Sequence, residues 1–198
     1  MAATYRTVWT VERATSDVRR TWIDAAYARF QSGGLGDVRV ELLARDIGTT
    51  KGSFYWHFRN RRSLVDAVME RWEAEQTEAI ISAAEQAGNA RGRLSRLFSA
   101  VADDWSKRGG EATLYVSAQH EGVGAFVSRV TQRRSDYVTD LLIELGLGAA
   151  EARRRSTIAL AAVVGLQHLS IVSNSALTGI DRDALTATAL AMCTAGLP

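Results

Sequence analysis

Proline, cysteine and long apolar stretches are scarce in this chain of 198 residues, and each scarcity excludes something. The one proline is the final residue, Pro198, which fits an almost wholly helical protein because proline is costly inside helices. The single cysteine, Cys193, excludes an intramolecular disulfide framework and a cysteine-based zinc site. No apolar run approaches the ~20 residues that span a bilayer, and the polar N-terminus does not resemble a signal peptide. We therefore expect a cytoplasmic protein that does not act at a membrane.

Sequence patterns typical of enzymes are also missing. Asp103 and Asp104 are neighbours on a predicted helix, about 100° apart, and so do not form a focused pair of carboxylates. His120-Glu121 lacks the second histidine of a zinc-binding helix. The chain has no phosphate-binding loop, dinucleotide fingerprint or G-x-S-x-G turn, and Cys193 has no histidine beside it. We predict that the protein is not an enzyme and has no cofactor or metal.

What the chain does contain is a hydrophobic content of 46%, enough for a substantial core, and an uneven distribution of charge. Residues 1–62 hold 11 Lys and Arg against 6 Asp and Glu, a net charge of +5, whereas residues 63–198 hold 13 against 16, a net charge of −3. A basic part joined to an acidic part suits a nucleic-acid-binding domain followed by a module with another role. Ordinary scatter of surface charge would explain the same imbalance. We predict domains at 1–62 and 63–198.

The most informative segment runs from Asp46 to Arg62, DIGTTKGSFYWHFRNRR. Helical patterns lie on both sides of Gly48, as in a helix-turn-helix, and the hydroxyl of Thr50 can cap a second helix that reaches about Phe58. Small side chains would let this helix approach another surface closely, and its many donors suit phosphate oxygens. DNA is the best single explanation.

Residues 19–64 resemble the N-terminal domain of the TetR family of bacterial transcriptional regulators. The match rests on spacing and residue type together, at Ala25, Ala26, Phe30, Gly34, Val40, Leu43, Ala44, Gly48, Thr50, Gly52, Phe54, Tyr55, His57, Phe58 and Leu64. The resemblance implies a three-helix DNA-binding domain, a C-terminal helical domain for ligand binding and dimerisation, and a homodimer that places two recognition helices in successive major grooves of a pseudo-palindromic operator.

Carried over by position, Tyr55 and His57 are expected to contact the DNA backbone. Arg61 replaces a lysine that is common at the start of the family's helix 4, which is predicted here at about residues 61–86. Lys51, Ser53 and Trp56 occupy variable positions and are candidates for contacts with base edges. The family commonly has Thr-Ser where this chain has Val38-Arg39, so Arg39 would have to supply the missing phosphate contact. The predicted DNA-binding residues are Arg39, Thr50, Lys51, Gly52, Ser53, Tyr55, Trp56, His57 and Arg61. Trp22, Phe54 and Phe58 are better interpreted as core.

Apolar periodicity predicts helices near residues 17–30, 37–46, 50–58, 61–86, 90–108, 125–145, 149–173 and 181–195. Val18, Trp22, Ala26 and Phe30 mark the buried face of the first helix, and Asp37 is expected to cap the second. Residues 1–15 are expected to form a disordered tail or a flexible arm that reaches DNA. Gly109-Gly110 is expected to end the fifth helix, before a short segment that Gly122 and Gly124 close.

The segment Ile158–Leu166 is apolar on every side and therefore must be buried on every side. One face can meet the protein's own core, and a second copy of the chain is the economical partner for the other. A helix in the centre of a monomer is the alternative. The TetR resemblance also implies a dimer through the last two long helices. The predicted interface residues are Ile158, Ala161, Ala162, Gly165, Leu166 and Leu169.

The resemblance implies a small-molecule pocket in the second domain whose occupancy repositions helix 4. The candidates are polar or aromatic residues on otherwise apolar helices, each of which could instead be plain core packing: Trp72, Trp105, Tyr115, Gln119, His120, Phe126, His168 and Asn174. The leading hypothesis is a repressor released by a small effector. Activation, and a DNA-binding or architectural protein controlled by a protein partner with a filled C-terminal core, stay open.

Overall fold

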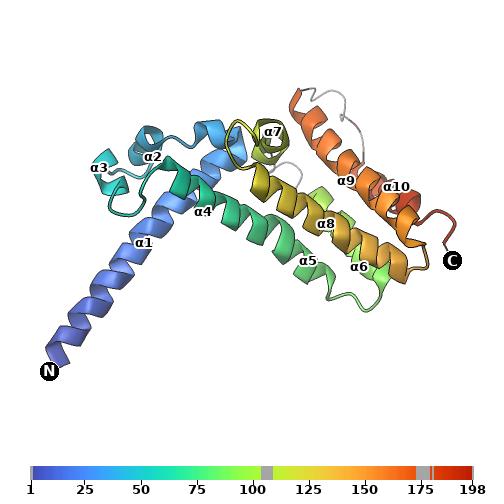
Figure 1. The fold of residues 1–198 in the computed structure, drawn as a ribbon, viewed down its shortest axis with the longest axis horizontal. Helices are drawn as coiled ribbons and strands as arrows, with labels where there is room; N and C mark the ends of the chain where they lie inside the picture. Colours follow the sequence, from blue (N-terminus) through green and yellow to red (C-terminus); the bar gives the residue numbers. More distant parts are fainter. Residues whose placement is uncertain (1, 104–108, 173–178, 180, 198) are drawn as a thin grey trace. The chain divides into compact units, whose positions relative to one another are not determined.

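The structure is a computed structural model that describes residues 2–103, 109–172, 179 and 181–197. Its regular elements are helices, and no strand occurs within these ranges. The all-α class predicted from the sequence is therefore confirmed. The chain forms two compact units, residues 1–71 and 72–198, which are coloured in sequence order in Figure 1. The first unit ends at Arg71, whereas the domain boundary predicted from the sequence follows Arg62.

The first unit contains a helix-turn-helix. Its helices are α1 (Ala2–Gly33), α2 (Val40–Asp46), α3 (Lys51–Phe54) and the larger part of α4 (Arg61–Glu73), with a 3-10 turn at Leu35–Asp37. Gly34 has a φ of 83° and Gly48 a φ of 66°, values that side chains with a Cβ rarely adopt. Gly34 ends α1, and Gly48 makes the turn between α2 and α3 that the sequence predicted.

Aromatic side chains fill the centre of this unit. The ring of Phe54 lies 5.3 Å from that of Trp22 in an edge-to-face contact and 5.4 Å from that of Phe58, and all three side chains are buried. Edge-to-face and offset contacts of this kind add to the free energy of apolar burial. The interpretation of these three residues as core is confirmed. The core fixes α3 against α1 and so determines which side of α3 faces solvent.

Several local predictions for the first unit are wrong. α1 begins at Ala2, not near Asp17, because no glycine or proline interrupts the chain before Gly33. Val18, expected in the core, is 40% exposed, since it lies a turn beyond the buried Trp22. Asp37 does not cap α2; it lies in the 3-10 turn, and Arg39 takes the cap position without a side-chain hydrogen bond.

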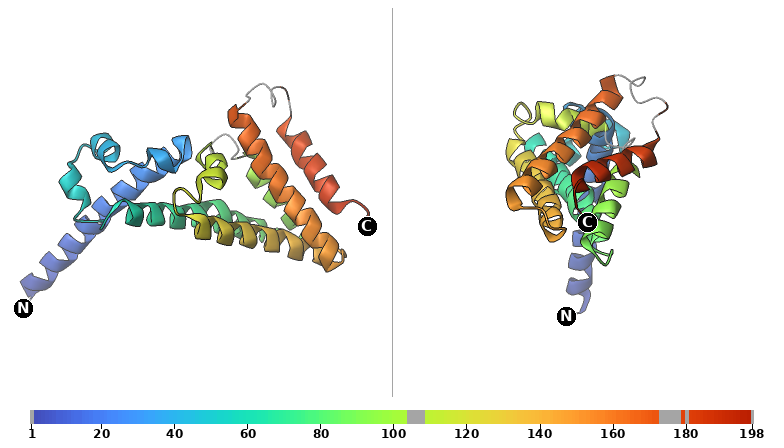
Figure 2. Two further views of the ribbon diagram at one scale, coloured as in Figure 1. Left: turned by 45° about the horizontal axis from the view of Figure 1, so that its top comes forward. Right: turned by 90° about the vertical axis from the view of Figure 1, so that its right-hand side faces the viewer.

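The second unit is a bundle of helices (Figures 1 and 2). After α4 the chain continues through a π-helical turn into α5 and the remaining helices, whose bounds are Ala74–Glu78 for the π turn, Ala79–Ala84 (α5), Ala90–Asp103 (α6), Gly109–Ser117 (α7), Gly124–Glu144 (α8), Ala149–Val172 (α9) and Arg182–Thr194 (α10). None of the helices in the described ranges is long and apolar enough to cross a membrane.

The core of this unit lies between α5, α6, α8, α9 and α10. Its buried residues include Leu94, Phe98, Leu141, Leu142 and Cys193. α8 packs along α9, and α10 packs against α6 and α9, as the two views of Figure 2 show. The predicted sequence of long helices is therefore confirmed for α6, α8, α9 and α10.

Two details differ from the sequence-based expectation. Gly109 and Gly110 were expected to end a helix, but they form the first turn of α7. The backbone N–H groups of a first turn have no partner within the helix, and this holds for glycine as for any other residue. The helix expected over 61–86 is one helical run, but residues 74–78 adopt a wider π turn. Such turns are frequent at functional sites.

Candidate DNA interface and effector cavity

The recognition helix begins with the cap predicted from the sequence. Thr50 has an extended backbone, and its hydroxyl oxygen accepts a hydrogen bond from the N–H of Ser53 over 3.3 Å. α3 is shorter than predicted, because after Phe54 the N–H groups of Tyr55, Trp56 and His57 bond to carbonyls three residues back. The N–H of Phe58 returns to the carbonyl of Phe54 over 2.9 Å. Residues 50–58 thus form one hydrogen-bonded segment, the first part of which is α-helical.

Two large aromatic side chains of this segment project into solvent. Trp56 is 86% exposed and Tyr55 is 58% exposed, whereas Phe54 between Ser53 and Tyr55 is fully buried. Lys51 and Gly52 are also exposed, and Ser53 and His57 are half-buried. A fully exposed tryptophan has no role in the core of this chain, and it is available to contact a base or a sugar.

Lys51, predicted to contact base edges, is paired within the protein. Its Nζ donates a hydrogen bond to Oε1 of Glu41 on α2 at 2.5 Å, and both side chains are exposed. This hydrogen bond lowers the pKa of Glu41 and raises that of Lys51. The ammonium group is therefore held between the two helices of the motif in the DNA-free protein.

Arg61 has a structural task that sequence reasoning missed. Its Nε donates to the carbonyl of Val38 at 2.7 Å and its Nη2 donates to the carbonyl of Leu35 at 2.5 Å. These bonds attach the start of α4 to the turn that precedes α2. Arg39, by contrast, is exposed, and its Nε reaches the carbonyl of Gly36 at 3.1 Å. Arg39 is thus the more accessible of the two arginines predicted to contact phosphate.

His57 is unusual among the predicted contacts. Its Nδ1 is buried and, within the described part of the chain, has no hydrogen-bond partner. The ring is half-buried beside the exposed Trp56. Buried polar atoms normally find partners, so an unsatisfied ring nitrogen at this position is consistent with a contact that forms only in a complex.

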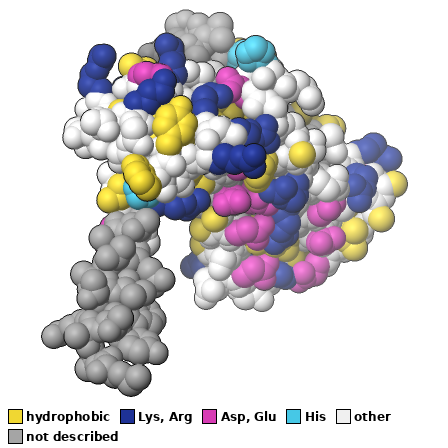
Figure 3. All heavy atoms as spheres, turned by 60° about the vertical axis from the view of Figure 1, so that its left-hand side comes forward, with side chains coloured by type: hydrophobic (Ala, Val, Ile, Leu, Met, Phe, Trp, Pro, Cys, Tyr) yellow, Lys and Arg dark blue, Asp and Glu magenta, His cyan; other side chains and the backbone are white. Residues whose placement is uncertain are grey.

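Charged side chains of both signs are interleaved on the face of the molecule drawn in Figure 3. In the second unit, arginines of α8 pair with glutamates of the α4–α5 run: Arg129 with Glu73, and Arg133 with Glu78. The net negative charge of residues 63–198 is therefore partly tied up in ion pairs on the surface.

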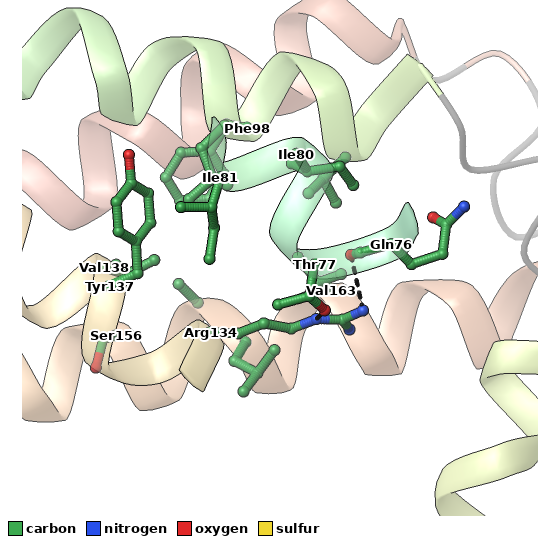
Figure 4. Close-up of a pocket in the computed structure, with 14 residues that line it drawn as sticks. Gln76, Thr77, Ile80, Ile81, Phe98, Arg134, Tyr137, Val138, Ser156 and Val163 are labelled. Carbon is green, nitrogen blue, oxygen red and sulfur yellow. Dashed lines mark hydrogen bonds between the residues drawn. The ribbon is translucent and has the colours of Figure 1, made fainter. Parts of the chain in front are cut away.

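A cavity of about 70 Å³ lies inside the second unit. Its wall is mainly apolar, with a few polar groups, and consists of Gln76, Thr77, Ile80, Ile81, Leu97, Phe98, Val101, Arg134, Tyr137, Val138, Ser156, Ala159, Leu160 and Val163. Figure 4 shows Arg134, Gln76 and Thr77 together at one end and Tyr137 with Ser156 at the other. Apolar walls with a few convergent polar groups are typical of small-molecule sites.

Arg134 joins three elements at the polar end of the cavity. Its Nη1 donates to Oε1 of Glu111 on α7 at 2.5 Å, its Nε to the hydroxyl of Thr77 at 2.9 Å, and its Nη2 to the carbonyl of Gln76 at 3.0 Å. The guanidinium also lies 5.1 Å from the ring of Trp72. Burial opposes the charge of Arg134, but Glu111 and the Tyr115 hydroxyl raise its pKa above the ordinary value. The arginine is therefore charged and fixed.

Of the pocket residues proposed from sequence, those that the structure describes do not line this cavity. Trp72 and Tyr115 come nearest, because both contact Arg134, and the Tyr115 hydroxyl lies 3.3 Å from its Nη1. Gln119 and His120 are exposed at the end of α7, and His168 is exposed on α9. Phe126 lies under the guanidinium of Arg129 at 4.6 Å. Trp105 and Asn174 lie outside the described residues. As ligand contacts, these residues stay predictions.

The sequence did contain a signal for Arg134. On α8 it follows the buried Val130 by four residues and precedes the buried Tyr137 by three, so a charged residue lies on the apolar face of an amphipathic helix. A charge at such a position needs a buried partner, and Glu111 is that partner. Gln76 and Thr77 gave no comparable signal, because the π turn that presents them was not predicted.

An apolar face of α9 is exposed in the single chain. Ile158 is 62% and Leu169 is 46% exposed, and Ala161, Ala162 and Gly165 are exposed between them. Leu166 is half-buried. The interpretation of α9 as a helix in the centre of a monomer is therefore wrong. Beside this face, α6, α9 and α10 enclose a second cavity of about 240 Å³ whose lining includes Ile158, Leu166, Leu185 and the 65% exposed Met192.

Comparison with known proteins connects this geometry to a family. Residues 23–68 match the family described as bacterial regulatory proteins, tetR family. The chain is 36% identical over 53 residues to the HTH-type transcriptional regulator SrpR of Pseudomonas putida, a match that covers 27% of this chain and 25% of SrpR. The chain thus matches only a quarter of the length of that relative.

The fold is shared over a greater length. A transcriptional regulator from Rhodococcus sp. Rha1 superimposes with a TM-score of 0.75 over 90% of this chain and 97% of its own, at 21% identity. FadR from Bacillus subtilis, solved in complex with stearoyl-CoA, superimposes with a TM-score of 0.63 over 90% of this chain and 99% of its own, at 16% identity.

In the described ranges, no group of His, Cys, Asp and Glu residues is placed to hold a metal ion.

Proposed function

We propose that this chain is a member of the TetR family and a sequence-specific transcriptional regulator, a repressor that leaves its operator when a small molecule binds the second unit; the match of residues 23–68 and the shared fold support this. The observation that supports DNA binding most directly is the exposed, capped segment 50–58. It carries Lys51, Tyr55 and Trp56 at the surface and is fixed from behind by Phe54 and Phe58.

A homodimer is part of the proposal. The exposed apolar face of α9 is a surface that a second copy would cover, and its small residues Ala161, Ala162 and Gly165 permit close approach of a partner helix. A two-fold dimer presents two recognition helices, which read half-sites about 34–36 Å apart on one side of the duplex. The operator is then a pseudo-palindrome.

The position of the cavity along the chain supports release by an effector. α4 begins at Arg61 next to the recognition segment and continues into the π turn, where Gln76 and Thr77 line the cavity. A ligand that changes the conformation of this turn changes the helix that leads to the DNA-binding unit. For release, the ligand must bind the conformation that does not bind DNA more tightly than the one that does.

The second candidate function is a DNA-binding protein without an effector, controlled by a protein partner. Such a protein needs no cavity, and its C-terminal core would be filled. The cavity beside Arg134 favours the effector-controlled regulator.

Mobility shifts on operator variants test the proposal. We expect Lys51→Ala to change the preference at particular base pairs, because Lys51 is a proposed contact with base edges, and Tyr55→Phe to weaken binding on every sequence, because the lost hydroxyl is a proposed contact with the DNA backbone. A uniform effect of Lys51→Ala would remove this residue from base recognition. Binding that is unchanged in both variants would contradict the proposed interface.

A further inference from the structure

We propose that the cavity beside Arg134 binds an uncharged, mostly apolar molecule that carries a hydrogen-bond donor, and that the Arg134–Glu111 ion pair excludes carboxylates and phosphates from it. This inference rests on the proposed effector function and specifies the chemical class of the effector.

The charge of Arg134 is already balanced within the protein. An arginine at the end of an apolar cavity would ordinarily attract an anion, but here Glu111 already neutralises it at 2.5 Å. All three guanidinium nitrogens donate hydrogen bonds to protein oxygens, those of Thr77, Glu111, Tyr115 and Gln76. The arginine therefore has its charge and its main hydrogen-bonding directions satisfied before any ligand enters.

Glu111, the partner of Arg134, is buried. Its side chain is 3% exposed, and that of Arg134 is 14% exposed. To pair with Arg134, a ligand anion would have to displace this carboxylate and leave it buried without its partner, which is strongly unfavourable. An anion that left the pair intact would meet an arginine whose charge Glu111 already balances, and it would lose its own hydration without a new counter-ion. Both outcomes disfavour an anionic ligand.

In the described part of the chain, the cavity wall includes a residue, Gln76, with an unsatisfied hydrogen-bond acceptor for a neutral ligand. Within the described residues, Oε1 of Gln76 is buried and has no hydrogen-bond partner. Gln76 lines the cavity, and Figure 4 shows its main-chain carbonyl bonded to Arg134 while its side-chain amide extends away from the guanidinium. An unsatisfied carbonyl oxygen needs a donor, such as the hydroxyl of an alcohol or the N–H of an amide. The other polar groups at the wall are used already: the Tyr137 hydroxyl donates to Glu85, and the Ser156 hydroxyl bonds to Thr139.

The remaining wall is apolar, with Ile80, Ile81, Phe98, Val138 and Leu160 among its residues. It provides the burial that drives binding of an alkyl or aryl group. The cavity of about 70 Å³ is smaller than the ~150 Å³ that accommodates benzene, so it suits a short chain, and one hydroxyl at the Gln76 end would satisfy the orphaned oxygen.

A matched pair of probes tests the proposal on the full-length protein. Titration calorimetry and thermal unfolding are measured with straight-chain alcohols from butanol to octanol, and with the carboxylates of the same chain lengths, at pH 7.5. We expect at least one alcohol to bind and to raise the Tm, and each carboxylate to bind at least roughly tenfold more weakly than its alcohol, a difference of about 1.4 kcal/mol.

The variant Glu111→Gln provides the reverse test. It keeps a hydrogen-bonding side chain beside Arg134 but removes the negative charge, so the carboxylates should gain affinity relative to the alcohols. Asp140→Asn, which removes an exposed carboxylate from α8, is the matched control and should leave the preference unchanged. If Glu111→Gln does not fold, the comparison of alcohols with carboxylates on the unaltered protein still decides the proposal.

Carboxylates that bind the unaltered protein as tightly as the alcohols would overturn the inference but leave the effector-controlled regulator standing. Failure of every probe in both series to bind would overturn the inference and also count against the cavity as an effector site. An unchanged preference in a folded Glu111→Gln variant would show that the ion pair does not select the ligand, and would also overturn the inference.

Discussion

Lys51, the first residue of the recognition helix, is hydrogen bonded to Glu41 on the preceding helix, with 2.5 Å between Nζ and Oε1. The pair connects the two helices of the motif on their exposed side. It also places a carboxylate at the surface expected to meet phosphate. DNA binding would therefore have to separate the pair or accept a negative charge near the duplex.

Glu41→Gln should tighten DNA binding. The change removes a negative charge from the proposed interface and frees the ammonium of Lys51, so affinity for operator and for random duplex should rise by roughly threefold at low salt. Fluorescence anisotropy with labelled duplexes measures this, and Glu70→Gln, which removes an exposed carboxylate from α4, is the control. The gain should shrink as salt is added. Weaker binding by the Glu41 variant would contradict the proposed orientation of α3.

Trp56→Ala should weaken DNA binding without lowering stability. The side chain is 86% exposed, so the folded unit gains little from it, whereas a contact with a base or sugar would be lost. We expect an unchanged Tm and a loss of affinity of roughly tenfold or more, equivalent to about 1.4 kcal/mol or more. Normal affinity in this variant would remove Trp56 from the interface. A large fall in Tm would mean that its ring packs against the protein.

Arg61→Ala should lower both stability and DNA affinity. The side chain donates to the carbonyls of Val38 and Leu35, and hydrogen bonds from a charged group are worth about 1.5–3 kcal/mol each. Thermal unfolding of Arg61→Ala beside Arg59→Ala, an exposed arginine two residues earlier, separates structure from charge. Both variants lose one positive charge, but only Arg61→Ala should unfold at a clearly lower temperature. Equal Tm values would show that the two carbonyl contacts contribute little.

The ion pair of Glu73 with Arg129 should make stability depend on pH in the acid range. The hydrogen bond from Arg129 lowers the pKa of Glu73 below its ordinary value of 4.5. Because the folded-state pKa is the lower one, the contribution is complete above pH 4.5 and is lost as the pH falls through the folded-state pKa. Glu73→Gln should therefore lower the Tm modestly at pH 7 and by less near pH 3. An equal loss at both pH values would contradict this assignment.

Ala161→Glu should impair dimer formation. Ala161 is exposed in the middle of the apolar face of α9, where a partner helix would bury the new charge without a counter-ion. Light scattering should show a monomer or a concentration-dependent equilibrium. Ala125→Glu, at an exposed position at the start of α8, should leave the dimer intact. A stable dimer in the Ala161 variant would place the interface elsewhere.

The helix-turn-helix was predictable because its determinants are local. Gly48 needs a positive φ and Thr50 caps the next helix, and both properties can be deduced from a few neighbouring residues. The apolar stripe of α4, with Leu64, Val68 and Met69 buried, followed from the helical period. These features require no knowledge of distant contacts.

The cavity could not be predicted in the same way, because its wall is brought together from α5, α6, α8, α9 and a π turn. Local periodicity does not distinguish a π turn from the helix around it. The roles of Arg61 and Arg134 depend on partners 23 residues or more away in sequence, at Val38 and Glu111. Arg61 was therefore interpreted as a DNA contact from its place in a basic segment. In the folded chain its guanidinium donates hydrogen bonds to the backbone carbonyls of Val38 and Leu35.

The central claim is that the protein recognises an operator sequence as a dimer. Selection of bound sequences from random duplex DNA by the purified protein, followed by a salt titration on the enriched sequence, tests it most directly. We predict a pseudo-palindrome with half-site centres about one helical turn, or ~34–36 Å, apart, and an affinity that falls steeply as salt is raised. Absence of any enriched sequence, with protein unfolded and refolded to remove bound ligand, would contradict the account.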